Sequence, residues 1–239
     1  MQLTVTNLNI EHEKMLLTNV NLDLKGGDTV SICGPIGSGK TSLLRVLGLL
    51  DKPKKGGSIY IDNSVNCTSL PQPEIDVFIN QYFAYVFQEF DLMEAWTTIE
   101  NIALPLIARG ETQEEIRKQV HYYCEQLGIA DYAEKKVSIL SSGTRKLVTL
   151  GRALAKEPKI LIADEPVANL DPETREKVAI FLKNRAKKKN MIIIAAAHLE
   201  EIKTIFDKQY NIENDTLRLV YKRQYENQNK VTYKIQKKK

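Results

Sequence analysis

The chain has 239 residues, of which 43% are hydrophobic and 27% charged, a composition typical of soluble globular proteins with one or two domains. Its formal net charge is +4, but seven of the 34 basic residues lie between residues 221 and 239, so the rest is nearly neutral and no nucleic-acid partner is expected. The three cysteines lie far apart in the sequence, which indicates neither a disulfide framework nor a paired-cysteine zinc site and favours a reducing cytosol.

The first fifty residues predict strands followed by a glycine-rich loop and a helix. Apolar and polar residues alternate around 3–5 and 20–24, which indicates an antiparallel edge layer. A short β-rich strand is predicted at 29–33, and the glycine-rich segment occupies 34–39. Leucines at helical spacing then predict a helix over 40–50. A strand, a glycine loop and a helix therefore follow one another in that order.

The middle of the chain predicts two more strands, a helical block and then a return to strands. Further strands are expected at 58–62 and 83–87. From 97 to 154, apolar residues recur at three- and four-residue spacings, and this block lacks strand signals. Strands return at 160–163 and 191–194 as continuous apolar runs, which are typical of parallel sheets covered on both faces.

This order predicts an α/β core that a helical segment interrupts. A helix is expected over 172–189, between the last two of these strands. No stretch rich in Pro, Gly and Ser separates the blocks, so we expect one domain over 1–239 rather than two linked domains. Its parts are a core of residues 1–88 and 158–220, a helical subdomain of 89–157, and a basic C-terminal extension of 221–239.

If the protein acts at a membrane, we expect it to act from outside the bilayer. The most apolar run, residues 191–197, is too short to cross as a helix, and the first residues show no secretion pattern. Near the other end, Val231, Tyr233 and Ile235 alternate with polar residues, which predicts a terminal strand with a basic outer face. Residues 237–239, all lysine, could attract anionic lipid headgroups or remain a solvated charge run.

The glycine-rich segment matches the phosphate-binding pattern G-x-x-x-x-G-K-[ST] in full, with the required strand before it and helix after it. Glycines let backbone N–H groups curl around phosphates, Lys40 reaches the β- and γ-phosphates, and Thr41 supplies an oxygen to magnesium. The alternative is a glycine-rich turn with a solvated lysine. The nucleotide-binding residues expected here are Gly34, Pro35, Ile36, Gly37, Ser38, Gly39, Lys40, Thr41 and Ser42.

A pair of carboxylates, Asp164 and Glu165, follows the apolar run at 160–163. The pair is expected at the carboxyl end of a buried strand, the edge where open α/β sheets bind ligands. Asp164 can hold magnesium, and Glu165 is placed to orient or deprotonate an attacking water, as phosphoryl transfer requires. The alternative is an acidic pair that caps a helix.

With these two motifs, the chain resembles the ATP-binding cassette (ABC) ATPases from about residue 3 to about residue 220. Gln88 resembles the Q-loop glutamine of that family, and His198 its switch histidine. Residues 140–144 (Leu-Ser-Ser-Gly-Thr) resemble the signature that opens a helix, and residues 168–171 (Ala-Asn-Leu-Asp) resemble the D-loop. The shared order of these motifs carries the resemblance, since each of them alone is weak.

The resemblance implies a fold, a reaction and a set of site residues. The fold is an α/β P-loop NTPase (RecA-like) core with an N-terminal antiparallel β layer and an inserted α-helical subdomain. The activity is ATP hydrolysis, with ATP and Mg²⁺ bound by the chain. The catalytic residues are expected to be Lys40, Glu165 and His198; the magnesium ligands, Thr41, Gln88 and Asp164; and the further nucleotide contacts, His12, Gln88, Ser141 and Gly143.

The resemblance also implies partners. Ser141 and Gly143 would complete the ATP pocket of a second cassette, either another copy of this chain or a paralogous ABC ATPase. The dimer would drive a separate integral-membrane permease from the cytoplasmic face of the cell membrane, meeting its coupling helix around residues 91–98. Residues 47–53 and 99–106 are similar to the subgroup that serves lipoprotein release and macrolide export, and to a related cell-division ATPase.

Two alternatives of other classes follow from the same motifs. A nucleotide-gated regulatory or cell-division ATPase would act on a membrane partner without moving a substrate. A soluble ABC protein acting on DNA or ribosomes is disfavoured, because those usually carry two cassettes or a long coiled-coil insertion.

The chain departs from the family pattern at several positions. Ser142 stands where the signature has its first glycine and Thr144 where it has glutamine, so weakened rather than abolished hydrolysis is expected. A β-carbon at 142 is costly if the backbone needs a positive φ or a close approach to phosphate, and the change is mild if the conformation is ordinary. His12 stands where the family stacks an aromatic ring on adenine, and it could equally be a solvated turn residue. Leu199 follows the switch histidine where an aspartate is usual.

Overall fold

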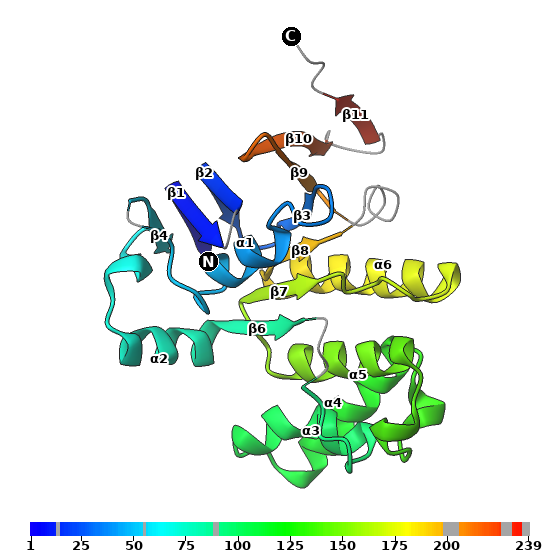
Figure 1. Cartoon of the computed structure of the whole chain (residues 1–239). Coiled ribbons are helices and arrows are strands. Elements are labelled where there is room, and N and C mark those ends of the chain that lie inside the picture. Colours follow the sequence, from blue (N-terminus) through cyan, green and yellow to red (C-terminus); the bar gives the residue numbers. More distant parts are fainter. Residues whose placement is uncertain (13–14, 55, 88–90, 198–205, 226–230, 236–239) are drawn as a thin grey trace.

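A computed structural model describes residues 1–12, 15–54, 56–87, 91–197, 206–225 and 231–235 of the chain. Two β-sheets and six α-helices make up most of this part of the chain, with the helical subdomain lying beyond the β6 edge of the larger sheet (Figure 1). The fold is the α/β arrangement expected from the sequence, a sheet-based core with an antiparallel β layer and an inserted helical block.

The smaller sheet is antiparallel and has the strand order β2-β1-β4-β5. Cross-strand partners such as Leu3 and Leu24, or Val5 and Leu22, are all buried, while the residues between them point outward. The edge layer predicted from the alternation is therefore confirmed. Its strands are β1 (Gln2–His12), β2 (Met15–Lys25), β4 (Ser58–Ile61) and β5 (Val65–Asn66).

The larger sheet has the order β11-β10-β9-β3-β8-β7-β6. Its centre is parallel, and every residue of β7 and β8 is buried, as their continuous apolar runs predict, and so is every residue of β3. The antiparallel strands β10 and β11 extend one side. The strands are β3 (Thr29–Cys33), β6 (Phe83–Val86), β7 (Ile160–Asp164), β8 (Ile192–Ala196), β9 (Lys208–Glu213), β10 (Thr216–Tyr225) and β11 (Val231–Ile235).

The two faces of this sheet belong to two hydrophobic cores. Ile160 and Ile162 of β7 lie in the core shared with α1 (Lys40–Leu47) and the smaller sheet, while Leu161 and Ala163 lie in the core shared with α6 (Pro172–Lys189) and the helical subdomain. Because side chains alternate along a strand, one apolar run fills both cores. The carboxyl ends of the parallel strands are thereby fixed between two layers of helices.

The helical subdomain contains α3 (Thr98–Ala108), α4 (Gln113–Gln126) and α5 (Ser142–Ala155). A capping box starts α3, in which Thr97 and Glu100 satisfy each other's backbone N–H groups. Helix α5 packs against α3, α4 and β6, so it connects the subdomain with the sheet. The short 3₁₀ segments are η1 (Cys67–Ser69), η2 (Ala130–Tyr132) and η3 (Val137–Ile139).

Several elements differ from the sequence expectations. The helix predicted over 40–50 ends at Leu47, where Gly48 caps it and Leu49 adopts a φ of +62°. Helix α2 (Gln72–Tyr82) was not predicted, although Ile75, Phe78, Ile79 and Tyr82 lie at three- and four-residue spacings and pack against the core shared with the smaller sheet. Strands β9 and β10 were also not predicted, and β10 runs through residue 220, so residues 221–225 continue the sheet.

The predicted terminal strand is present as β11, which pairs antiparallel with β10. Residues 226–230 and 236–239 lie outside the described part of the chain. Among the described helices, none is both long and apolar enough to cross a bilayer.

Candidate functional site

The glycine-rich loop joins the end of β3 to the start of α1 and depends on three glycines. Gly37 and Gly39 have φ values of +78° and +89°, which residues with a β-carbon rarely adopt. A β-carbon on Gly34 would lie 2.7 Å from Ser38 Oγ and 3.2 Å from Ile212 Cβ, so a side chain here would displace Ser38. Pro35 lies exposed in the loop, and the Ile36 side chain is 94% exposed at its apex. The glycines thus set a turn whose outer side is open.

The inner side of this loop fits an anion. Helix α1 begins at Lys40, and Gly39 at its N-cap has no side chain to cap it, so the N–H groups of the first turn, which includes Ser42, have no cap acceptor. Ser38 Oγ is buried and makes no hydrogen bond within the described residues. Orphaned donors at a helix N-terminus, beside the positive end of its dipole, are the features that bind phosphate oxygens.

Lys40 folds back over its own loop. Its Nζ donates hydrogen bonds to the carbonyl oxygens of Gly34 and Pro35, at 3.0 and 2.9 Å. These partners are main-chain carbonyls rather than carboxylates, so an incoming phosphate would be a stronger acceptor for the ammonium. The loop therefore keeps its cation close to the anion cradle.

Thr41 and Asp164 join the loop to the neighbouring strand end. Thr41 Oγ1 donates a 2.7 Å hydrogen bond to Asp164 Oδ2, although the two residues are 123 positions apart. Asp164 ends β7 and is 2% exposed. Burial raises the pKa of its carboxyl, and the nearby charge of Glu165 raises the pKa further, against the opposing effects of Thr41, Lys40 and Lys146. The end of β7 thus holds the Asp164 carboxylate in a buried position, where its negative charge costs free energy.

Glu165 follows directly in a strained conformation. Its φ is +51°, in the left-handed region, which costs a residue with a β-carbon roughly 1–2 kcal/mol. Its N–H donates to the carbonyl oxygen of Ala196 at 3.0 Å, so the end of β8 holds it. The side chain is half-buried beside Asp164. Strain of this kind is typical of functional sites.

The signature segment opens α5, as expected. Ser141 is the N-cap, and its Oγ accepts a hydrogen bond from the N–H of Thr144 at 3.2 Å and lies 2.9 Å from the hydroxyl of Thr144. Ser142 is the first helical residue and has no positive φ. The backbone conformation at this position therefore accepts serine, and replacing the glycine of the family signature causes no backbone strain here.

The D-loop segment lies against the signature within the same chain. A β-carbon on Gly143 would lie 3.2 Å from the carbonyl oxygen of Asn169, a tighter contact than most side chains make. Asn169 itself has a φ of +62°, and Asp171 caps α6 by accepting from the N–H of Thr174 at 3.0 Å. The glycine at 143 thus permits a close approach between the start of α5 and the turn before α6.

Three predicted residues are not placed. Gln88 and His198 lie outside the described residues, as does the side chain of His12, whose backbone ends β1. The strands that lead to the first two end at the same edge of the sheet as the loop: β6 ends at Val86 and pairs parallel with β7, and the N–H of Ala197 donates to the carbonyl oxygen of Ile32 on β3 at 3.1 Å.

One residue that the sequence analysis missed reaches this site. Lys146 of α5 is 5% exposed, and its Nζ donates to the carbonyl oxygens of Glu165 and Ala168, at 2.9 and 3.3 Å. A lysine within the buried face of an amphipathic helix was the available signal. No group of three or more His, Cys, Asp or Glu side chains in the described residues could hold a metal by itself.

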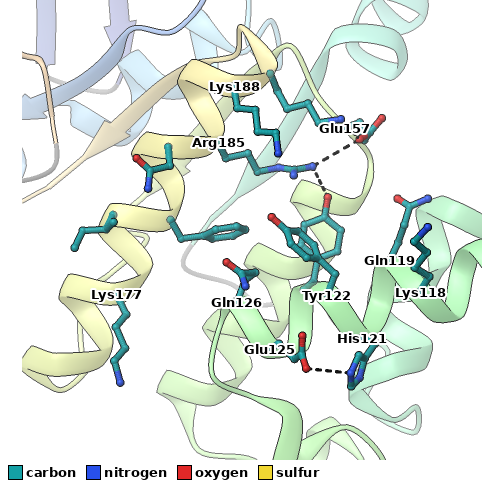
Figure 2. A pocket seen from close by; sticks show the side chains of 15 residues that line it. Lys118, Gln119, His121, Tyr122, Glu125, Gln126, Glu157, Lys177, Arg185 and Lys188 are labelled. Atoms are coloured by element: carbon teal, nitrogen blue, oxygen red, sulfur yellow. Dashed lines mark hydrogen bonds and ion pairs between the residues drawn. The ribbon is translucent and has the colours of Figure 1, made fainter.

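A separate groove of about 1000 Å³ lies between α4 and α6 and shares no residue with the phosphate loop. Figure 2 shows Arg185 pointing across it toward Glu157. Arg185 also donates to the hydroxyl of Tyr123, which itself donates to the carbonyl oxygen of Leu154 at 2.8 Å. These contacts tie α6 to the helical subdomain, so they link the two halves of the molecule outside the candidate site.

Comparison with known proteins agrees with this geometry. Residues 17–168 match the protein family described as ABC transporter. The lipoprotein-releasing system ATP-binding protein LolD of Rickettsia bellii is 32% identical over 204 residues, which cover 85% of this chain and 89% of that protein. The uncharacterized ABC transporter ATP-binding protein MJ0796 of Methanocaldococcus jannaschii is 38% identical over 186 residues, which cover 76% and 78% of the two chains.

Solved structures give the same result. The chain superposes with a TM-score of 0.80 and 30% identity on the ATP-binding cassette MJ0796, described as the dimeric structure of a post-hydrolysis state bound to ADP and Pi. The match covers 91% of this chain and 97% of that one. A second dimeric structure of MJ0796 gives the same TM-score and identity over 90% and 96% of the chains.

The buried charge of Asp164 predicts a gain in stability on its removal. Asp164→Asn keeps an acceptor for Thr41 but removes the desolvated carboxylate, so the nucleotide-free protein should melt higher by roughly 2–4 °C, the shift that about 1 kcal/mol produces at this size. Thermal unfolding followed by circular dichroism measures this. The matched control is Asp171→Asn at the exposed cap of α6, where hydrogen bonds with Thr174 lower the carboxyl pKa and no gain is expected. A melting temperature for Asp164→Asn at or below wild type would contradict the argument.

Proposed function

Because this chain belongs to the ABC transporter family as an ATP-binding subunit with ATPase activity, we propose that it dimerises on ATP and drives a separate integral-membrane permease. The observation that carries the proposal is the hydrogen bond from Thr41 to Asp164, which brings the phosphate loop and the acidic strand end into one site. The experiment that tests it is ATP hydrolysis measured together with the dimeric state.

The chain's own residues divide the work of hydrolysis. The glycine loop binds the phosphates through its N–H groups, and Lys40 leaves the carbonyls of Gly34 and Pro35 to contact the β- and γ-phosphates. Glu165, half-buried at the sheet edge, orients the attacking water and accepts its proton. His198 lies outside the described residues, and we assign it the γ-phosphate contact of the switch histidine that it resembles.

Magnesium fits the donor set of this site. One hydroxyl and one carboxylate, from Thr41 and Asp164, meet at the end of β7, and Gln88 would add a third oxygen. Mg²⁺ is usually held by one or two protein oxygens together with substrate phosphates and waters. A small number of protein ligands is therefore sufficient here. When bound, the ion would neutralise charge that develops on the phosphates.

Dimerisation would supply the other side of the nucleotide. The start of α5, with Ser141 and Gly143, lies at the surface and would contact the ATP held by a second copy or by a paralogous cassette. The N-terminus of a 14-residue helix offers N–H donors and a positive dipole end to phosphates. The dimeric MJ0796 structure with ADP and Pi supports this arrangement.

The permease partner is supported by the relatives' names and by one exposed surface. LolD is described as the ATP-binding protein of a lipoprotein-releasing system. In the segment 91–98, Met93 and Trp96 are 46% and 36% exposed, an apolar surface that would meet the permease. The chain would then lie on the cytoplasmic face of the cell membrane. The relatives' names favour transport over the regulatory or cell-division alternative.

Two substitutions test the catalytic assignment. Lys40→Ala should weaken ATP binding and abolish hydrolysis, because the loop loses its cation. Glu165→Gln should retain binding but reduce hydrolysis by at least about 100-fold, leaving a dimer trapped by ATP. Phosphate release and light scattering measure both effects, with the exposed Lys177→Ala as control. Turnover by Glu165→Gln equal to that of wild type would remove Glu165 from its role.

A second comparison tests the signature. Ser141→Ala and Thr112→Ala each remove an N-cap with the same geometry, from α5 and α4, and each should cost about 1 kcal/mol of stability. Only Ser141→Ala should weaken the ATP-trapped dimer when combined with Glu165→Gln. Analytical ultracentrifugation with ATP compares them, and equal dimer affinity for the two variants would contradict a role of the signature in the partner's site.

A further inference from the structure

Lys146 links α5 to the turn that carries Glu165. Its ammonium reaches two main-chain carbonyl oxygens, those of Glu165 at 2.9 Å and Ala168 at 3.3 Å, and the residue is 5% exposed. These two residues are the first and last of a tight turn, because the N–H of Ala168 donates to the carbonyl oxygen of Glu165 at 3.2 Å. One cation therefore holds both ends of the turn.

The turn needs such support. Glu165 has a φ of +51°, and Pro166 follows it, which disfavours the right-handed helical region for the residue before the proline. Asn169, directly after the turn, has a φ of +62°. Two non-glycine residues in the left-handed region, Glu165 at the start of the turn and Asn169 directly after it, mark a segment whose conformation its surroundings impose.

A buried ammonium is a costly way to supply two hydrogen bonds. An apolar residue would suit the buried face of α5, where Leu147, Val148 and Leu150 are its neighbours. The charge has compensation here, because Asp164 lies close enough for Lys146 to lower the carboxyl's pKa. The lysine thus stands at the point where the signature helix, the acidic pair and the D-loop segment converge.

We propose that Lys146 is a positioning residue that fixes the main chain of Glu165, so that the orientation of α5 sets the position of the Glu165 carboxylate. A movement of the signature helix would then change the placement of this carboxylate within the same subunit. The inference rests on the proposed role of Glu165 in hydrolysis. It goes further than that role, because the helix that would contact the partner's nucleotide would also set the position of the catalytic carboxylate in its own subunit.

The test compares two substitutions of Lys146 with one matched control. Lys146→Met keeps the length and apolar stem but removes the donor, whereas Lys146→Gln restores an uncharged N–H donor. The control is Lys156→Met, because Lys156 at the other end of α5 also donates to two main-chain carbonyls, those of Ile79 and Phe83, at 3.2 and 2.7 Å. These carbonyls lie away from the acidic pair.

Steady-state ATPase kinetics and amide hydrogen exchange give the readouts. Lys146→Met should lower kcat by about 10- to 100-fold with KM within about twofold of wild type, the effect of a misplaced catalytic group. The Ala168 amide should exchange faster in the same variant. Lys146→Gln should recover most of both properties, and Lys156→Met should leave kcat and Ala168 exchange at wild-type values.

The outcomes separate this inference from the proposed function. A Lys146→Met protein with wild-type kcat, or with Ala168 exchange unchanged, would overturn the positioning role. If Lys146→Met and Lys156→Met lost kcat equally, the effect would be general stability, and the role would again be overturned. A wild-type protein without ATPase activity would instead refute the proposed function, while exchange at Ala168 would still decide whether Lys146 holds the turn.

Discussion

The hydrogen bond between Thr41 and Asp164 is the contact on which the site depends, because it joins the start of α1, which follows the phosphate loop, to the end of β7. Strands β3 and β7 do not neighbour each other; β8 lies between them, and all three run parallel. Parallel strands bring their carboxyl ends to the same edge, so whatever follows them meets there. The phosphate loop follows β3, and the acidic pair follows β7. The fold thereby brings two residues that lie 123 positions apart in the sequence into a hydrogen bond of 2.7 Å.

Around this contact, the chain accepts local costs that a purely structural site would avoid. Asp164 is desolvated, Glu165 is held in the left-handed region, and Lys146 buries an ammonium. Each cost is offset by a named partner: Thr41 for the first, the carbonyl oxygen of Ala196 for the second, and the carbonyl oxygens of the Glu165 turn for the third. The two hydrophobic cores on either side of the sheet supply the stability that sustains them.

Sequence reasoning was most successful where the signal is local. Residues 160–163 and 191–194 are continuous apolar runs in a parallel sheet, so both strands were predicted. Helix α2 and the strands β9 and β10 were missed, although apolar residues recur in them at helical or alternating spacing and pack against the core. These segments therefore carry the periodic signal of half-buried elements, and the sequence pattern was sufficient to predict them.

The residues of the candidate site likewise fall into those that a local motif identifies and those that only the folded chain brings together. The phosphate loop is a contiguous motif whose chemistry is set by its own residues, so its members could be named from the sequence. Lys146 could not, because its partners are main-chain oxygens about twenty residues away, and any residue type offers those. The conformation of Ser142 also needed the structure, since its mild effect rests on an ordinary φ at the start of α5.

The most direct test of the central claim is the effect of Mg²⁺ on the affinity for a non-hydrolysable ATP analogue, measured by calorimetry. Wild type, Thr41→Val and Asp164→Asn should bind the analogue alike without Mg²⁺, because the loop supplies that affinity. Mg²⁺ should raise the affinity of wild type by about tenfold or more and leave both variants nearly unchanged. An equal gain from Mg²⁺ in all three proteins would show that the loop and the acidic strand end do not form one site.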